Sequence, residues 1–487
     1  MHRVFSALEH HAVADPARPA FLKTDGSALT YGQLAAAVAD FSAILPVGAQ
    51  TVALRGIPSF AWVVADLAAT LAGKRVVPVP MFFSKEQIGF ILKDAECGLI
   101  VDCNLPEDAQ RQNGGIPVLR LNDEHIANAR PARHLPVYQG GAERVIYTSG
   151  TTGRPKGVRH GDRQLDFAVS AIGEAVAATA DDRHLSLLPP ALLLEQIAGF
   201  FLPITVGAQS VLAPGAGIAA LTGDIAPMAQ ALSSVKPTTT VLVPQLVSAL
   251  VRLSDASGWC PPTSLRIAAV GGAPIAPSVL DAADAIGLPV RYGYGLSECC
   301  SVVSVDRAAN TNHDQGPVRP TGRPLPGTDI RIEDGEIIVR SPGVMIGYLN
   351  HPEIGTQEWR TGDLGRIEPD GRVTVLGRKD RRLILSNGRN VSPEWIESHA
   401  AGLPWVETAT ATGHGEPHVT LHLTVRTPDD SWLDATPDSE FAEQLNALFA
   451  TLPDYARPVR AEISQSRNPD RIRAIPLDLR QPTSNVA

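Results

Sequence analysis

The stretch YTSGTTGRPKG, from Tyr147 to Gly157, is the part of the sequence that says most about fold and chemistry. Its glycines let the backbone turn tightly and bring N–H groups close to a polyanion. Its hydroxyl groups add donors and its lysine adds a mobile positive charge, so the stretch suits the β- and γ-phosphates of a nucleotide. Residues 144–147 are β-branched and aromatic and predict a strand that leads into this loop. The residues predicted to contact phosphate are Thr148, Ser149, Gly150, Thr151, Thr152, Gly153 and Lys156.

A solvated turn and a P-loop are the alternatives to this kind of phosphate loop. Solvated Ser/Thr/Gly turns are common, but a run this dense in hydroxyls that ends in Pro-Lys-Gly is rare by chance. The stretch does not contain the pattern GxxxxGK[ST], which argues against a kinase or a P-loop ATPase. Phosphate binding is therefore favoured if further nucleotide-binding motifs follow along the chain.

Length and composition exclude several classes of protein. A chain of 487 residues is too long for one ordinary core and predicts two or more domains. Hydrophobic residues make up 44% and charged residues 19%, as in globular proteins. The formal net charge of −9 argues against a nucleic-acid partner or an anionic membrane surface.

The cysteines and the most apolar stretch indicate a cytoplasmic protein without a transmembrane segment. The five cysteines show no CxxC spacing, which fits reduced thiols in the cytosol, and the N-terminal residues carry no apolar signal core. Residues 60–79 are interrupted by Asp66, Lys74 and Arg75 and therefore predict a buried helix followed by a strand.

Strand and helix patterns alternate through residues 4–101 and again through residues 164–300, which predicts parallel, doubly wound sheets. From Gly322 short strands separated by Asp-Gly turns predict a β-rich subdomain. The predicted fold is α/β. A large N-terminal domain, residues 1–377, contains two doubly wound sheets and the β-rich subdomain. A small, mobile α+β domain, residues 378–487, follows it.

Two glycine-bearing turns follow predicted strands of the second set. They are Gly271-Gly272-Ala273-Pro274 and Tyr294-Gly295-Leu296-Ser297-Glu298. In open α/β sheets, ligands bind just beyond the carboxyl ends of the strands, where both turns fall.

Taken in order, these motifs resemble those of the adenylate-forming superfamily. This superfamily includes the acyl-CoA synthetases of the AMP-dependent synthetase and ligase family, peptide-synthetase adenylation domains and luciferases. Arg360-Thr361-Gly362-Asp363 and Gly377-Arg378-Lys379-Asp380 continue the resemblance, which covers the chain from about residue 15 to about residue 458.

The resemblance implies a role for each motif in binding ATP and Mg²⁺. Residues 271–274 would lie along adenine, Tyr294 would pack against it, and Gly295 belongs to the same turn. Ser297 would contact the α-phosphate and Glu298 would help to hold Mg²⁺. Asp363 would accept hydrogen bonds from both ribose hydroxyls, and Arg378 would contact ribose or phosphate. Asp380 would be the hinge about which the small domain rotates, and residues 386–394 would face the site during thiol transfer.

The implied reaction has two steps. A carboxylic acid and ATP give acyl-AMP and pyrophosphate, and a thiol then takes the acyl group. The thiol would belong to coenzyme A or to the phosphopantetheine of a carrier protein. Residues 188–196, LPPALLLEQ, lie where the family has its acid-pocket motif, and their leucines favour an apolar, fatty-acyl-like acid. Ordinary core packing is the alternative for these leucines.

The family's C-terminal Gly-Lys pair is missing here. No lysine follows Lys379, and residues 466–473 contain neither glycine nor lysine. Arg471, or Arg473, is the candidate to supply the charge, although the planar guanidinium is larger than an ammonium group. Three hypotheses remain open: an active ligase that uses arginine, an enzyme of the second half-reaction, and a pseudoenzyme that binds nucleotide or acyl-adenylate.

Overall fold

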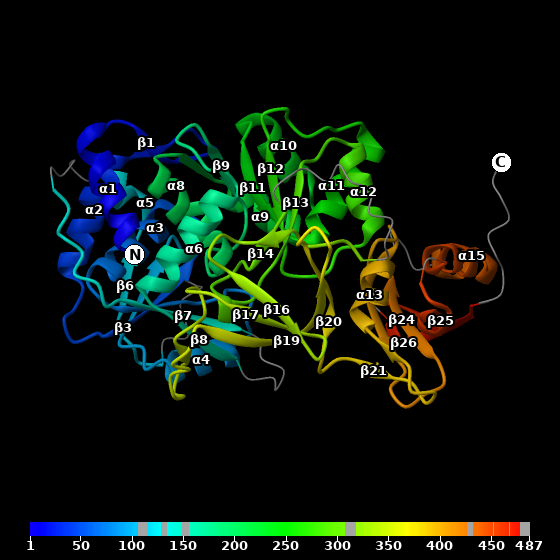
Figure 1. The fold of residues 1–487 in the computed structure, drawn as a ribbon. Coiled ribbons are helices and arrows are strands. Elements are labelled where there is room, and N and C mark those ends of the chain that lie inside the picture. Colours follow the sequence, from blue (N-terminus) through cyan, green and yellow to red (C-terminus); the bar gives the residue numbers. More distant parts are fainter. Residues whose placement is uncertain are drawn as a thin grey trace.

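The computed structural model describes residues 1–105, 114–127, 134–148, 155–306, 318–425, 432–450, 452–466 and 468–477. Figure 1 shows a large body, coloured blue to yellow, and a smaller orange-to-red unit at one side of it. The large body contains two extended sheets and one smaller antiparallel sheet, and the smaller unit has a sheet of its own. The predicted α/β fold class is confirmed.

The first extended sheet has seven strands in the order β18-β8-β7-β4-β3-β5-β6. Its inner strands are parallel, whereas β8 is antiparallel to both β7 and β18. The sheet is therefore mixed at one edge. Its strands are β3 Thr51–Gly56, β4 Arg75–Pro78, β5 Leu99–Cys103, β6 Val118–Leu121, β7 Glu143–Thr148, β8 Lys156–His160 and β18 Gly347–Tyr348.

Helices cover both faces of this sheet. Val52 and Leu54 pack in a cluster with α3 (Phe60–Leu71), whereas Ala53 packs with residues of α4 (Lys85–Asp94) on the opposite face. This division follows from the two-residue period of a strand, which sends successive side chains to opposite faces. The buried helix and strand predicted for residues 60–79 are α3 and β4.

The second extended sheet has nine strands in the order β15-β14-β13-β12-β11-β9-β10-β1-β2. Its first strand in the chain, β1, pairs in parallel with β10, so the strand near residue 20 belongs to this sheet and not to the first one. Local pattern predicted the strand but could not identify its partner. The strands are β1 Pro19–Lys23, β2 Ala28–Thr30, β9 Arg183–Ser186, β10 Gln209–Leu212, β11 Thr239–Leu242, β12 Ile267–Val270, β13 Val290–Tyr294, β14 Ser304–Val305 and β15 Arg323–Pro324.

The helical stretch of residues 193–206 contains a π-helical segment. It consists of α7 (Leu193–Glu195), the π-helix η2 (Gln196–Phe201) and α8 (Leu202–Val206). Pro203 has no N–H to donate and its ring crowds the preceding turn, which explains why the helix widens just before it. Phe200 and Phe201 of η2 are buried in the core that joins the two extended sheets.

The remaining helices of the large body surround these sheets. Thr30 caps α2, as predicted, and exchanges hydrogen bonds with Gln33. None of the described helices combines the length and apolar character that a bilayer crossing requires. These helices are α1 His2–Ala14, α2 Tyr31–Ile44, α5 Asp123–Ala127, α6 Asp162–Ala175, α9 Pro214–Leu221, α10 Ala226–Val235, α11 Pro244–Ser257, α12 Pro277–Ala285 and the 3₁₀ turn η3 Ser297–Cys299.

The β-rich region forms a four-stranded antiparallel sheet in the order β16-β17-β19-β20. The Asp-Gly turn between β16 and β17 is one of those predicted after Gly322. Gly347 and Tyr348 belong to the seven-stranded sheet. The strands are β16 Asp329–Glu333, β17 Glu336–Arg340, β19 Glu358–Ile367 and β20 Val373–Arg378.

The smaller unit has its own hydrophobic core. Apolar residues from Leu383 to Leu477 form one cluster that includes no residue of the large body. Its sheet has the order β23-β24-β25-β26. Its elements are β21 Leu383–Ile384, β22 Asn390–Val391, α13 Pro393–Ala401, β23 Val406–Thr412, β24 Val419–Val425, α14 Trp432–Ala435, α15 Asp438–Phe449, η4 Asp454–Ala456, β25 Pro458–Gln465 and β26 Asn468–Pro476.

Candidate active site

The two glycine-bearing turns lie next to each other at one edge of the nine-stranded sheet. Strands β12 and β13 are parallel neighbours, so residues 271–274 and 295–298 leave the sheet at the same edge. Between this edge and α13 lies a cavity of about 320 Å³, which we call the hinge cavity. Its lining includes Gly272, Ala273, Pro274, Tyr294, Gly295, Asp363 and Arg378. Motif residues from four distant stretches of the chain therefore line one cavity.

Gly295 has to be a glycine in this fold. After it the chain doubles back through Cys300 and Ser301, both with positive φ. A Cβ atom on Gly295 would lie 1.6 Å from the carbonyl oxygen of Ser301, far inside van der Waals contact. The missing side chain thus lets the turn fold back on itself.

The carboxylate of Asp363 is held between two other motif residues. The hydroxyl of Tyr294 donates to its Oδ2 at 2.5 Å, and Arg378 donates to its Oδ1 at 3.2 Å. Asp363 is buried within β19, which rules out an exposed turn at this position. Burial raises the pKa of Asp363, and Tyr294 and Arg378 oppose this effect. The two donors offset only part of the effect of burial, and they orient the carboxyl group inside the cavity.

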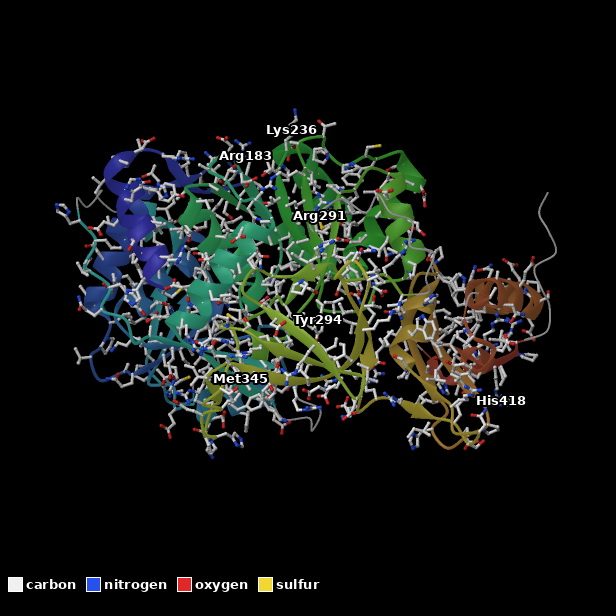
Figure 2. All side chains as sticks on the ribbon, in the orientation of Figure 1. Arg183, Lys236, Arg291, Tyr294, Met345 and His418 are labelled. Carbon is white, nitrogen blue, oxygen red and sulfur yellow. The ribbon has the colours of Figure 1, made fainter. Side chains whose placement is uncertain are left out.

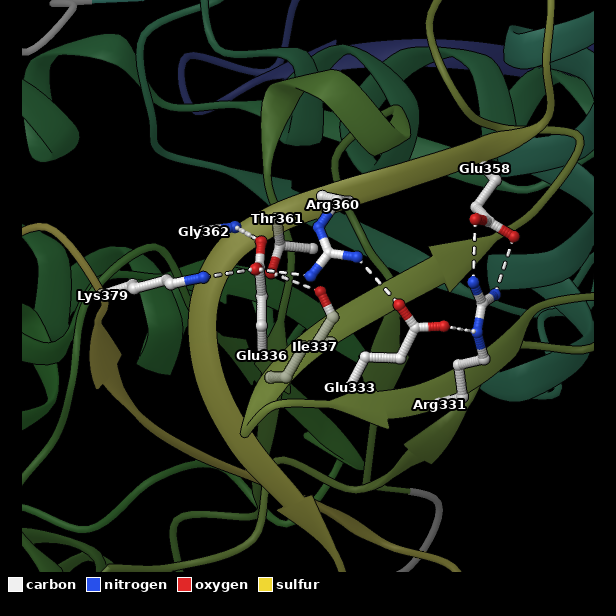
Figure 3. A network of polar contacts seen from close by, with 9 residues as sticks. All are labelled: Arg331, Glu333, Glu336, Ile337, Glu358, Arg360, Thr361, Gly362 and Lys379. Atoms are coloured by element: carbon white, nitrogen blue, oxygen red, sulfur yellow. Dashed lines mark hydrogen bonds and ion pairs between the residues drawn. The ribbon is translucent and has the colours of Figure 1, made fainter.

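A second carboxylate, Glu336, holds the part of β19 that precedes Asp363 (Figure 3). It accepts the N–H of Gly362 at 3.1 Å, Arg360 at 3.0 Å and Lys379 at 3.0 Å. Burial alone would raise the pKa of Glu336, but these donors outweigh it and hold the pKa below its ordinary value. Because Lys379 follows β20, the same carboxylate ties the start of the smaller unit to the β-rich sheet.

Lys156, Tyr348 and Glu298 form a chain of contacts that begins at β8, the strand that follows the glycine-rich stretch. Thr148 ends β7 and pairs with Lys156 at the start of β8, so the intervening residues connect two antiparallel strands. The Lys156 ammonium lies 5.7 Å from the centre of the Tyr348 ring, and the Tyr348 hydroxyl donates to Glu298 at 2.7 Å. The other predicted phosphate contacts lie outside the described residues: Ser149, Gly150, Thr151, Thr152 and Gly153.

Glu298 offers one carboxylate to a metal ion. Its Oε1 accepts the Tyr348 hydroxyl, which orients the group. Within the part of the chain that the structure describes, no three His, Cys, Asp or Glu side chains form a metal-binding cluster. Such a donor set fits Mg²⁺ held mainly by phosphate oxygens and water, and it does not fit a site built entirely from protein ligands.

A second cavity of about 300 Å³ extends along the nine-stranded sheet, and we call it the sheet cavity. It shares Gly272, Tyr294 and Gly295 with the hinge cavity, so the two adjoin at the ends of β12 and β13. Gly271 and Ser297 line the sheet cavity. Its apolar wall includes Leu188, Leu192, Leu193, Leu194, Ala198 and Val241.

Glu195 points away from this wall into the protein interior. Its side chain is fully buried and accepts a hydrogen bond from Ser186 at 2.5 Å. Burial raises the pKa of Glu195 to about 8, so the carboxyl is largely protonated at neutral pH. Glu195 is therefore unsuited to pairing with a substrate amine in the sheet cavity.

The C-terminal arginines lie away from both cavities. Arg473 is held inside the smaller unit by Asp438 and the carbonyl of Leu433. Arg471 lies exposed on β26 and lines neither cavity. The smaller unit instead presents Glu394, Trp395 and Ser398 of α13 to the hinge cavity. The catalytic role assigned to Arg471 stays a prediction.

Sequence reasoning missed three contributors to the site: Tyr348, Glu336 and Trp395. Tyr348 and Glu336 lie outside the stretches to which the sequence analysis assigned contacts with nucleotide or metal. Glu336 follows an Asp-Gly turn and begins the apolar run Ile337-Ile338-Val339. A glutamate at the start of a buried strand needs polar partners, and this was the available signal. No local pattern indicated that Trp395 would face the hinge cavity.

Comparison with known proteins identifies the class of this protein. The model of the AMP-binding enzyme family matches residues 8–349, so the chain belongs to this family. As predicted, it is an AMP-forming ligase.

Individual relatives differ in substrate. The chain is 24% identical to long-chain-fatty-acid–CoA ligase FadD15 of Mycobacterium bovis, over 88% of this chain and 82% of the relative. It is 27% identical to 2-succinylbenzoate–CoA ligase of Bacillus licheniformis, over 80% of this chain and 81% of that one. Among solved structures, o-succinylbenzoate CoA synthetase of Bacillus subtilis, with its acyl-adenylate, has a TM-score of 0.75 at 22% identity, covering 94% of both chains. The anthranilate CoA ligase AuaEII has a TM-score of 0.79 at 20% identity, covering 96% of this chain and 93% of that chain.

Proposed function

We propose that the protein activates a carboxylic acid with ATP and Mg²⁺ and transfers the acyl group to the thiol of coenzyme A. The observation that carries this proposal is the hinge cavity, where Tyr294, Asp363 and Arg378 meet the turn of residues 271–274. It adjoins an apolar cavity of a size that suits an acyl or aryl group. Relatives named for CoA ligation and a similar fold solved with ATP and magnesium support the same proposal.

In the first step the acid's carboxylate oxygen attacks the α-phosphorus of ATP, and pyrophosphate leaves. Asp363 binds the ribose hydroxyls, because a carboxylate accepts two hydrogen bonds at once. Lys156 and the hydroxyl-rich stretch neutralise the charge that builds up on the leaving pyrophosphate. Glu298 would hold Mg²⁺, which when bound would further neutralise the charge of the phosphates. The protein needs no covalent nucleophile, since holding both reactants in the adjoining cavities provides the positioning.

In the second step the thiol sulfur attacks the acyl carbon, and AMP leaves. Residues 386–394 and α13 belong to this step in our proposal, because Glu394 and Trp395 face the hinge cavity. We place the domain boundary at residues 377/378 and the hinge at Asp380. Rotation about it would bring β26, with Arg471, toward the site for adenylation. A phosphopantetheine-bearing carrier protein is the alternative acceptor.

The acid in this proposal has an apolar body. The leucines of the sheet-cavity wall favour a fatty-acyl or aryl group, and the inward orientation of Glu195 disfavours an amino acid. The names of the relatives include fatty acid, 2-succinylbenzoate and anthranilate, so the class of acid is the part that most needs measurement.

Pyrophosphate release from ATP and Mg²⁺ with fatty, aryl and amino acids, without thiol, tests the first step. Release with one class is expected, and Lys156→Ala should slow it at least about 100-fold if the ammonium neutralises pyrophosphate. No release with any acid, despite ATP binding, would remove adenylation from the proposal. Coenzyme A and a preformed acyl-adenylate would then distinguish a thioester-forming enzyme from a pseudoenzyme.

A further inference from the structure

The sheet cavity has polar side chains as well as its apolar wall. Strand alternation places His184, Thr239, Ile267 and Arg291 on the face of the sheet that borders this cavity. Asp182 and Arg266 join them from positions just before β9 and β12. A cavity lined only for a hydrocarbon chain would not need these groups, because each loses hydration when it is buried.

Most of these polar groups already have partners within the protein. Arg266 donates to both carboxylate oxygens of Asp182, at 2.9 and 2.6 Å, and to the carbonyl of Val176 at 2.7 Å. His184 Nδ1 lies 3.0 Å from the Thr239 hydroxyl. These contacts explain Asp182, Arg266 and Thr239 at the cavity. The buried Nε2 of His184 has no hydrogen-bond partner among the described residues, but burial lowers the pKa of His184 to about 4, so its ring is neutral and carries no positive charge.

Arg291 is different. One nitrogen of its guanidinium is buried and has no hydrogen-bond partner among the described residues. Burial lowers the pKa of Arg291, Asp306 opposes this effect, and Arg266 adds to it. A buried cationic N–H without an acceptor is costly, and an oxygen of a bound ligand would remove that cost.

The position of Arg291 relative to the reacting end of the cavity is fixed by β13. Gly293 and Gly295 are two and four residues further along the chain, which in an extended strand corresponds to roughly 7 and 13 Å. In Figure 2 the Arg291 label lies on the far side of Tyr294 from the β-rich sheet, toward the edge where Arg183 and Lys236 are found. The backbone of Arg291 is therefore set back along β13 from the edge where Gly271, Gly295 and Ser297 line the cavity.

We propose that the sheet cavity selects acids that carry a second oxygen acceptor, preferably a carboxylate, at a distance from the carboxylate that reacts. Arg291 donates to this second oxygen, while the leucine wall contacts the apolar segment between the two. The inference rests on the proposed function, because it assumes that the acyl group occupies the sheet cavity. A distal carbonyl oxygen shares the required chemistry with a carboxylate, and the test separates the two.

Binding of non-reactive acyl-adenylate analogues tests this directly. Three acyl-sulfamoyl adenosines with the same eight-carbon acyl chain would end in a methyl group, a methyl ketone or a carboxylate. Calorimetry on the full chain should give about 10- to 100-fold tighter binding for the carboxylate-ended analogue than for the methyl-ended one, as for a charge-assisted hydrogen bond. Tight binding of the ketone as well would support the proposal and assign a neutral acceptor to the site.

Variants identify the residue responsible. Arg291→Met should abolish the preference while still binding the methyl-ended analogue, and Arg291→Lys should retain part of it. Arg163→Met, on the exposed surface of α6, is the matched control and should keep the full preference.

Two negative results have different meanings. Equal affinities of the analogues in the wild type, or an unchanged preference in Arg291→Met, would overturn this inference and leave the proposed function intact. Failure of the folded wild type to bind any analogue would overturn both.

Discussion

Asp363 illustrates how single residues of this site depend on each other. It bridges Tyr294 and Arg378, and its own turn is fixed by Glu336 through the N–H of Gly362. A nucleotide would therefore meet a carboxylate that is already oriented. Binding would then cost little conformational entropy of the Asp363 side chain.

We expect Asp363→Asn to weaken ATP binding about 10- to 100-fold, because an amide has one acceptor oxygen and no charge to offer two hydroxyls. Calorimetric titration of ATP with Mg²⁺, in the absence of acid, would measure this. Tyr294→Phe removes one donor to Asp363 and leaves the carboxylate, so its effect should be smaller. An unchanged ATP affinity in Asp363→Asn would contradict the ribose assignment.

Glu195 predicts a specific dependence of stability on pH. Its folded pKa of about 8 lies above the unfolded value of 4.5, so the folded state retains a proton that the unfolded state loses between these values. Folding stability from this group is thus full below pH 4.5 and declines as the pH rises toward 8.

Glu195→Gln removes the titration. Relative to this variant, the wild type should lose on the order of 3 kcal/mol of unfolding free energy between about pH 5 and about pH 8. Urea unfolding at the two pH values gives the unfolding free energy of each protein. Subtracting the value of the variant from that of the wild type cancels the contributions of all other titrating groups. A difference that does not vary with pH would show that Glu195 is ionised throughout.

At the scale of elements, the buried Arg144 of β7 joins this strand to α3 by an ion pair and to the π-helix η2 by a hydrogen bond. Arg144 of β7 contacts Asp66 of α3 at 2.7 Å and donates to Gln196 of η2 at 2.7 Å. Gln196 in turn donates to the carbonyl of Pro190 at 2.8 Å, next to the wall of the sheet cavity. Arg144 thus connects a strand of the seven-stranded sheet, α3 and the helical segment that borders the sheet cavity.

We expect Arg144→Met to destabilise the protein by about 3–5 kcal/mol, because it leaves Asp66 buried without its cation. Chemical denaturation measures this. The double variant Asp66→Leu with Arg144→Met removes both charges and should recover much of the stability. If the losses of unfolding free energy in the two single variants simply added in the double variant, the ion pair would not be the reason for the loss.

At the scale of the whole molecule, the smaller unit contacts the large body beside the hinge cavity. Lys379 pairs with Glu336, and α13 packs against β20 and lines the cavity. Its core is separate from the cores of the large body. Such an arrangement permits the two units to move relative to each other, since interfaces of limited area yield more easily than cores.

Denaturant unfolding of the full chain is accordingly expected to show two transitions. ATP with Mg²⁺ should raise the midpoint of the large body, which holds Asp363 and Lys156, more than that of the smaller unit. Trp405 and Trp432 pack together in the core of the smaller unit, so the transition whose fluorescence change is lost in the double variant Trp405→Phe with Trp432→Phe is that of the smaller unit. A single transition shifted as a whole by ATP would mean that the two units unfold together.

The sequence alone determined the α/β class, most strands and helices, and the motif residues at the strand ends, because these follow from local periodicity and from short runs of glycine and polar residues. Gly295 and Asp363 could be selected in this way. Only the tertiary structure decided that β1 joins the second sheet, that β8 and β18 close an antiparallel edge, and that Tyr348 connects Lys156 with Glu298. It also decided that Glu195 faces inward whereas Arg291 borders the sheet cavity. The physical reason is that partner choice between strands, burial and side-chain contacts depend on residues far apart in the chain, which no local pattern specifies.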